Sequence, residues 1–261
     1  MAYSTLLYEV ADGVATMTLN RPEVRNAFND QMAEEMQAAL KAAERDAAVR
    51  CLVVTGAGAG FCAGQDLSAM RERGAGVSFR EHLQHTYNPI VAKLASIEKP
   101  AIAAVNGAAA GAGFGIALAC DFRYASEAAR FRMAFIGIAL APDSGTSYFL
   151  PRFVGLGRAL ELAYTNELID APTALSLGLV NKVLPADQLM PATLDLARRL
   201  AQAPTRSLGL TKRAMNYALT ATLTEALDYE AHVQEIAGRS GDYREGVGAF
   251  LEKRTPQFKG Q

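Results

Sequence analysis

Two glycine-rich segments, residues 61–67 and 106–115, hold the residue types in this sequence that could do chemistry. Each follows a short apolar run, 51–55 and 101–105, typical of a buried β-strand, and each leads into a helix-like stretch. Small residues at such turns leave backbone N–H groups uncovered. Two N–H groups aimed at one point form an oxyanion hole, which stabilises the negative oxygen that develops in acyl and enolate chemistry.

The sequence gives less support to a purely structural turn, a dinucleotide site or a metal site. A glycine-rich turn taken alone more often lets a strand pack closely against a helix. The glycines of 111–115 lack the Gly-x-Gly-x-x-Gly spacing of a dinucleotide site, and no acidic residue follows the next strand in the usual way. His82 and His85 could share a helix face, but no third ligand lies nearby, so a solvated surface pair is predicted and no metal site.

The composition is that of a globular protein with a large core: 261 residues, 50% hydrophobic and 20% charged. A net charge of −1 gives no general attraction to nucleic acid or to an anionic membrane. Cys51, Cys62 and Cys120 are an odd number without zinc-ligand spacing, so free thiols in a reducing compartment are expected. The chain opens on a strand pattern without a basic-then-apolar leader, and its longest apolar stretch, 108–120, is too short to span a bilayer. A cytoplasmic protein that binds neither nucleic acid nor membrane is expected.

The elements that must position the two turns repeat along the chain. Apolar patterning predicts strands at 6–10, 14–19, 51–55, 101–105, 121–125, 131–133 and 179–184. It predicts helices at 30–47 with an Asn29-Asp30 cap, at 79–96, after Gly111 and from about Asp143. Repeated strand–strand–helix units predict an α/β spiral of parallel strands over 1–186. From 187 to 261 only amphipathic helices are predicted (187–201, 205–219, 223–238, 242–253), which is typical of an oligomerisation region.

Further motifs accompany the two turns in a fixed order. They are Asn20-Arg21-Pro22, Arg25-Asn26-Ala27, the run from Lys99 to Gly107, Cys120-Asp121, the run from Pro142 to Thr146, the run from Ala174 to Asn181, and the ending from Glu245 to Arg254. Together they resemble the enoyl-CoA hydratase/isomerase (crotonase) superfamily over nearly the whole chain. The resemblance implies a spiral core of ββα units and a helical tail that packs into homotrimers, often paired into hexamers.

The resemblance also implies a substrate and a set of site residues. The substrate is an acyl-CoA thioester, so coenzyme A is part of the substrate and no separate cofactor is expected. The backbone N–H groups of Gln65 and Ala112 fall at the two oxyanion-hole positions. The implied CoA and substrate contacts are Arg25 near the phosphates, Ala63, Asp66 and Leu67 around the adenine, Gly111, and Lys253 offered by a neighbouring subunit. Without the resemblance, Arg25 and Lys253 are ordinary solvated surface charges.

The resemblance also distinguishes between the possible reactions, because each reaction needs acidic side chains at particular positions to carry protons. Hydratases use two glutamates, and their positions hold Gly115 and Phe135 here, neither of which can move a proton. Asp143 alone reads as a helix N-cap, but isomerases of this superfamily place their single essential acid in this loop. One carboxylate suits a proton shift between two carbons. Apolar neighbours would raise its pKa and a helix start would lower it.

The finer expectation is an isomerase of epoxidised phenylacetyl-CoA or of a related enoyl-CoA. Residues 87–90, 142–147 and 150–152 most resemble the isomerases of phenylacetate catabolism that act on 1,2-epoxyphenylacetyl-CoA. Segment 70–90 is expected to form part of the acyl pocket. The alternatives are a hydratase with a displaced acid, a 4-chlorobenzoyl-CoA-type dehalogenase with Asp143 as nucleophile, and a non-catalytic scaffold that binds RNA or a partner. The dehalogenase is disfavoured because Phe135 cannot act as a base, and an RNA scaffold because aromatic–basic patches are missing.

Overall fold

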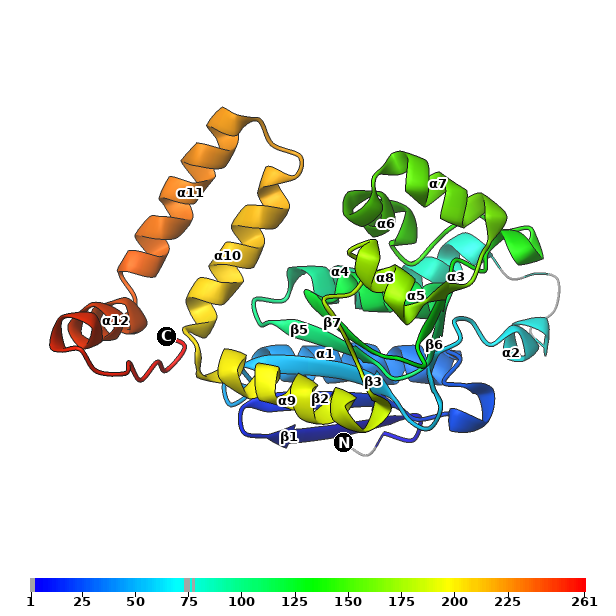
Figure 1. Cartoon of the computed structure of the whole chain (residues 1–261), viewed down its shortest axis with the longest axis horizontal. Coiled ribbons are helices and arrows are strands. Elements are labelled where there is room, and N and C mark those ends of the chain that lie inside the picture. The colour runs from blue at the N-terminus through cyan, green and yellow to red at the C-terminus, as the bar shows by residue number, and fades with distance from the viewer. Residues whose placement is uncertain (1–2, 73–75, 77) are drawn as a thin grey trace.

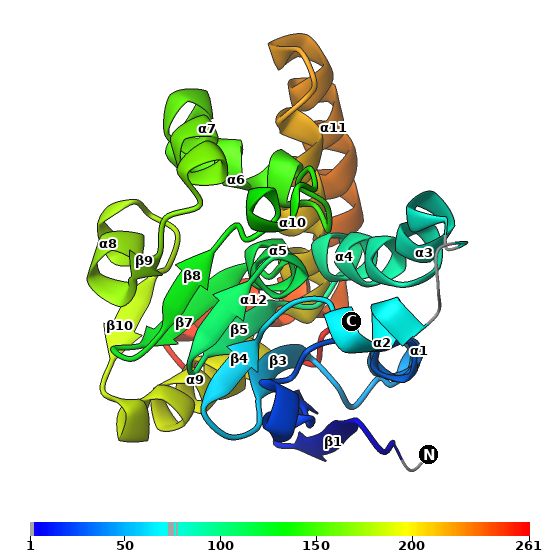
Figure 2. The same ribbon diagram turned by 90° about the vertical axis from the view of Figure 1, so that its right-hand side faces the viewer.

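The computed structural model describes residues 3–72, 76 and 78–261. Its larger sheet has six strands in the order β1-β2-β3-β5-β7-β10. Their bounds are β1 (Leu6–Ala11), β2 (Val14–Leu19), β3 (Cys51–Gly56), β5 (Ala101–Val105), β7 (Phe122–Ser126) and β10 (Lys182–Leu184). The β1–β2 pair is antiparallel around a turn at Asp12-Gly13, where both residues have positive φ, and the other pairs are parallel. Figure 2 shows β3, β5 and β7 as neighbouring arrows.

The strands of a second, smaller sheet alternate along the chain with those of the first. Its order is β4-β6-β8-β9, with β4 (Gly60–Cys62), β6 (Ala108–Ala110), β8 (Arg130–Arg132) and β9 (Ile169–Asp170). Each of β3, β5 and β7 therefore continues into one strand of the smaller sheet, which is the strand–strand unit of the predicted spiral. The predicted fold class is confirmed. Strands β4, β6 and β9 were not predicted. Strand β9 has two residues, and the sequences of β4 (Gly-Phe-Cys) and β6 (Ala-Ala-Ala) show no alternation of apolar and polar residues.

The helices of the core are α1 (Asp30–Arg45), α2 (Leu67–Glu72), α3 (Phe79–His85), α4 (Tyr87–Ser96), α5 (Ala112–Ala119), α6 (Thr146–Val154), α7 (Leu156–Thr165), α8 (Ala171–Ser176) and α9 (Ala186–Gln202), with 3₁₀ turns η1 (Pro22–Val24) and η2 (Ile136–Ile138). Helix α9 packs on one face of the larger sheet, and α1 and α4 pack on the other (Figures 1 and 2). The predicted cap of α1 is confirmed, since the Asn29 side chain accepts a hydrogen bond from Met32 N–H at 2.9 Å.

The helix predicted over 79–96 is two helices that break at Thr86. Pro89 explains the break, because proline lacks an N–H and its ring would clash with the carbonyl of the residue four before it. That carbonyl belongs to His85 and accepts a hydrogen bond from Gln37 Nε2 of α1 at 2.8 Å instead. Residues 73–75 and 77, which belong to the segment 70–90 predicted to form part of the acyl pocket, lie outside the described residues.

The carboxyl-terminal helices form an arm. Helix α9 packs on the larger sheet, where Ala197 and Ala201 join Val14, Val53 and Ile102 in one buried cluster. Helices α10 (Thr205–Ala218), α11 (Leu223–Gly238) and α12 (Gly241–Glu252) leave the core, as Figure 1 shows. The four helices predicted from 187 onward correspond to α9, α10, α11 and α12. Because α9 packs on the core, the projecting part begins after Gln202. No helix among the described residues is long and apolar enough to cross a membrane.

Candidate active site

The first glycine-rich turn fixes the direction of the Gln65 N–H. Phe28 N–H donates to Gly64 O at 2.7 Å, and Asp66 N–H donates to Phe28 O at 2.9 Å. The carbonyl and N–H of a trans peptide unit point in opposite directions. Because the Gly64 carbonyl faces Phe28, the Gln65 N–H in the same peptide unit points away from Phe28. The turn needs glycine, since Gly64 has φ +93°.

The second glycine-rich turn brings the Ala112 N–H to the same place. Ala112 is the first residue of α5, and N–H groups of a first helical turn have no partner inside the helix. A Cβ atom at Gly64 would lie 3.4 Å from Ala112 N and 2.8 Å from Ala110 O. The two turns are therefore in van der Waals contact, and both N–H groups are available at one edge of a cavity. The N-terminal end of α5 adds a partial positive charge there.

Two asparagine side chains hold the backbone beneath these turns. Asn106 Nδ2 donates to the carbonyls of Gly56 and Gly58, both at 2.9 Å, and Gly56 N–H donates back to Asn106 Oδ1 at 3.2 Å. Asn26 Nδ2 donates to Gly60 O at 2.8 Å. These bonds lock the loop between β3 and β4 to the start of β6, so the positions of the two turns are linked.

The cavity at this edge has a volume of about 330 Å³. Its wall is mainly apolar, with four polar side chains. The lining residues are Ala63, Gly64, Gln65, Leu67, Met70, Phe79, His82, Leu83, Tyr87, Gly111, Ala112, Ala134, Phe135, Ile138, Leu140 and Asp143. An apolar cavity with a few convergent polar groups is the usual form of a small-molecule site.

Asp143 lines the cavity and is a suitable proton carrier. Its Oδ1 accepts a hydrogen bond from Ser144 Oγ at 2.8 Å. Burial raises the pKa of the Asp143 carboxyl above its ordinary value, and the Ser144 hydrogen bond opposes that rise. The N-cap interpretation of Asp143 is wrong, because α6 begins at Thr146 and the Asp143 backbone carbonyl, rather than its carboxylate, accepts the Thr146 N–H at 2.9 Å.

Neither of the two positions that hold glutamates in hydratases can supply a carboxylate in this chain. A Cβ atom at Gly115 would lie 2.3 Å from Ser144 O and 3.0 Å from Ser144 Cβ. Gly115 thus lets the Asp143–Ser144 loop pack directly on α5, and a larger side chain has no room there. At the second position the Phe135 side chain is buried and forms part of the apolar wall.

The residues implied for CoA binding fall into two groups. Arg25 is exposed, and its carbonyl accepts Ala63 N–H at 3.0 Å, so it lies beside the first turn. Ala63, Leu67 and Gly111 line the cavity, and Arg25 does not. Lys253 is the C-cap of α12, and Figure 1 shows α12 on the arm, at the opposite end of the molecule from α2 and α3. The structure therefore does not bring Lys253 to the cavity of its own chain.

The Asp66 side chain serves the protein itself. Its carboxylate pairs with Arg21 at 2.9 Å and accepts the Ser68 and Ala69 N–H groups at 3.1 and 3.2 Å. Burial alone would raise the pKa of Asp66, but the hydrogen bonds from Ala69 and Arg21 hold it below the usual range. Since the Asp66 N–H already donates to Phe28 O, the group of Asp66 left for a ligand is its backbone carbonyl, which can accept a second hydrogen bond.

The sequence analysis missed His82 and Tyr87 as site residues. The predicted surface pair is wrong for His82, which is 9% exposed and lines the cavity, while His85 is exposed. Tyr87 is 2% exposed and lines the same cavity. A possible signal was the helical spacing of His82 with Leu83, Tyr87 and Ile90, which places all four toward the core.

Comparison with known proteins decides the family. The family model described as "Enoyl-CoA hydratase/isomerase" matches residues 9–261. The chain belongs to the enoyl-CoA hydratase/isomerase family. It is 47% identical over 258 residues to 1,2-epoxyphenylacetyl-CoA isomerase of Escherichia coli (strain K12), with 98% of each chain covered. It is 36% identical over 259 residues to crotonyl-CoA hydratase of Syntrophomonas wolfei, with 99% of each covered. A crystal structure of enoyl-CoA hydratase from Bacillus anthracis matches with a TM-score of 0.92 at 33% identity, covering 99% of this chain and 100% of that one.

Membership of the enoyl-CoA hydratase/isomerase family makes the chain an enzyme of CoA-thioester chemistry, similar to relatives named isomerase and relatives named hydratase.

Proposed function

We propose that this member of the family is an acyl-CoA isomerase that moves a proton between two carbons of the acyl group. The observation that carries the proposal is the set of proton carriers. Among the described lining residues Asp143 is the one carboxylate, and the hydratase positions hold Gly115 and Phe135. One carboxylate can take a proton from one carbon and return it to another.

The proposed mechanism uses the two N–H groups and Asp143 together. The thioester oxygen lies between the Gln65 and Ala112 N–H groups, which stabilise the enolate that forms when the α-proton leaves. Ser144 holds Asp143 Oδ1, so Oδ2 takes the proton and returns it. The raised pKa of Asp143 makes it a stronger base than an exposed aspartate. These groups suffice for the shift, so we propose no cofactor beyond the CoA of the substrate.

We further propose 1,2-epoxyphenylacetyl-CoA as substrate, or a related enoyl-CoA. The support is the 47% identity to the relative of that name together with the cavity wall. Phe79, Phe135 and Met70 offer an aromatic and apolar surface to a ring.

The test is turnover of a panel of acyl-CoA thioesters that includes epoxidised phenylacetyl-CoA and 2- and 3-enoyl-CoA chains. Absorbance follows the reaction and mass spectrometry identifies the product. Isomerisation leaves the mass unchanged, whereas hydration adds the mass of one water molecule. Hydratase activity with a displaced acid is the second candidate, favoured by the similarity to crotonyl-CoA hydratase, and hydration of any panel member as the main reaction would establish it instead.

We also propose that the chain forms homotrimers, or hexamers made of two trimers, through the arm. Helices α10, α11 and α12 border a cleft of about 970 Å³ and expose large apolar side chains, with Met215 at 68%, Phe250 at 82% and Leu251 at 74% exposure. Patches of this kind mark contact surfaces. In such an assembly we expect Lys253 of one subunit to lie near the CoA of another. Sedimentation velocity at micromolar concentration should give three or six times the chain mass, and a stable monomer would contradict the proposal.

A further inference from the structure

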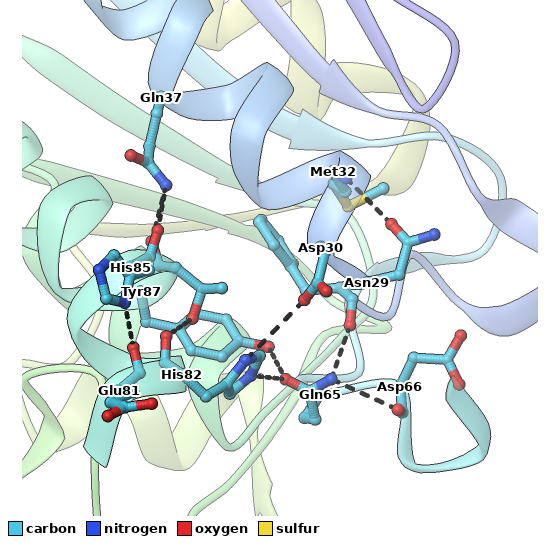
Figure 3. A network of polar contacts seen from close by, with 12 residues as sticks. Asn29, Asp30, Met32, Gln37, Gln65, Asp66, Glu81, His82, His85 and Tyr87 are labelled. Carbon is cyan, nitrogen blue, oxygen red and sulfur yellow. Dashed lines mark hydrogen bonds and ion pairs between the residues drawn. The ribbon is translucent and has the colours of Figure 1, made fainter. Parts of the chain in front are cut away.

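The side chain of Gln65 is held by four hydrogen bonds, although only its backbone N–H belongs to the proposed oxyanion hole. Oε1 accepts from Tyr87 Oη at 2.8 Å and lies 2.9 Å from His82 Nε2. Nε2 donates to Phe28 O at 3.2 Å and, at 3.4 Å, to Asp66 O. Figure 3 shows His82 and Tyr87 pointing at the Gln65 amide from one side. We call this arrangement of Gln65, His82 and Tyr87 the amide clamp.

The chemistry of the partners fixes the direction of each hydrogen bond to the Gln65 amide. The Phe28 and Asp66 carbonyls can only accept, so the Gln65 NH₂ group must face them. Oε1 therefore faces His82 and Tyr87, and both must donate to it. His82 thus carries a proton on Nε2, and the Tyr87 hydroxyl hydrogen points at Gln65. Neither proton is directed at the cavity, so in this arrangement neither group acts on the substrate as an acid.

The amide clamp joins separate helices to the first glycine-rich turn. His82 comes from α3 and Tyr87 from α4, and His82 Nδ1 lies 3.8 Å from Asp30 Oδ1 of α1. The Tyr87 ring also packs against Phe28 with centroids 5.6 Å apart. Phe28 is the residue whose N–H holds the Gly64 carbonyl, so the Gln65 peptide is held by Phe28 on its backbone side and by the clamp through its side chain.

We propose that His82 and Tyr87 are positioning residues that act through the Gln65 side chain to aim the Gln65 backbone N–H at the thioester oxygen. This inference rests on the proposed function. Rotation of Gln65 about its backbone would turn the N–H away from the oxygen, and the strength of a hydrogen bond falls steeply as its angle departs from linear. The hydrogen bonds to both Oε1 and Nε2 of the Gln65 side chain oppose that rotation.

A double-mutant cycle tests the inference on the full-length protein, with a substrate that the wild type isomerises. Tyr87→Phe removes only a hydroxyl, and Gln65→Met removes the amide while keeping the backbone N–H. We expect Tyr87→Phe to lower kcat about tenfold with little change in KM, below the ~10²-fold that a ~1 Å misplacement can cost. If Tyr87 acts through Gln65, the double variant is no slower than Gln65→Met. Tyr124→Phe, on β7 and outside the amide clamp, is the matched control and should keep its full kcat.

Two outcomes would overturn the inference. One is full kcat in Tyr87→Phe. The other is a double variant slower than Gln65→Met by the whole Tyr87→Phe factor, since Tyr87 would then act on the substrate independently. Should Tyr87→Phe fail to fold, His82→Gln and His82→Leu replace it: glutamine can still donate to Gln65 and should retain most of kcat, whereas leucine should not. Equal kcat in these two variants contradicts the role of His82. Failure of the wild type to isomerise any acyl-CoA would instead refute the proposed function.

Discussion

Replacing Asp143 by asparagine is expected to lower turnover by about 10²-fold or more, the usual range for loss of a general base. Binding of acyl-CoA should change little, because an asparagine Oδ1 can still accept the hydrogen bond from Ser144. The physical reason is that an amide cannot take the α-proton, while the proposed oxyanion hole of Gln65 and Ala112 is unchanged. Steady-state kinetics and calorimetric binding of a product thioester measure the two effects separately. Asp187→Asn, an exposed aspartate on α9, is the matched control.

The same substitution should raise thermal stability. Burial raises the folded-state pKa of Asp143 above its unfolded value, so the protonated side chain is the form that the fold favours. The contribution of Asp143 to the free energy of unfolding is fully present below its unfolded-state pKa. It is lost as the pH rises through its folded-state pKa. Near neutral pH the wild type carries the costly ionised form, and asparagine does not. The variant should therefore have the higher Tm near neutral pH, with the difference vanishing in acid.

Full activity of Asp143→Asn on every isomerisable thioester would contradict the proposed role of Asp143 as the proton carrier.

Substituting alanine for Gly64 is expected to lower kcat by ~10²–10³-fold, the loss that follows removal of one oxyanion-hole donor. Gly64 has φ +93°, which strains any residue with a Cβ atom. Its Cβ would lie 2.8 Å from Ala110 O and 3.4 Å from Ala112 N. The two turns must move apart, and the Gln65 and Ala112 N–H groups can no longer meet at one oxygen. Gly157→Ala on α7, where an added Cβ meets nothing within 4 Å, is the control.

The result of Gly64→Ala is to be judged on folded protein. Circular dichroism and the elution volume of the assembly should match those of the wild type before kcat is compared. A folded variant with kcat within about twofold of the wild type would show that the Gln65 N–H is not a donor in the reaction, because ~2.7–4 kcal/mol of barrier is the expected loss.

Local chemistry allowed much of the fold to be predicted. The Asp12-Gly13 turn, the Asn29 cap and the apolar runs of β3 and β5 depend on residues close in sequence. The break at Thr86 was missed but could have been predicted, since Pro89 disfavours a continuous helix.

The amide clamp could not be predicted from local patterns. Gln65, His82 and Tyr87 meet only because α3 and α4 dock beside α1, and docking of this kind is decided by long-range packing. The requirement for glycine at position 115 could not be predicted either. A Cβ atom there would clash with Ser144, which is 29 positions later in the chain and meets α5 only in the folded protein. The Asp143 cap interpretation was wrong for a related reason, because Ser144 and Gly145 take positive φ and carry the chain past Asp143 before α6 begins.

The most direct test is a crystal structure of Asp143→Asn with a bound acyl-CoA that the wild type isomerises. The account predicts the thioester oxygen within ~3.5 Å of both Gln65 N and Ala112 N, the limit for a hydrogen bond, with the side chain at position 143 facing the α-carbon. A thioester oxygen farther than ~3.5 Å from both nitrogens, or an α-carbon out of reach of position 143, would contradict it.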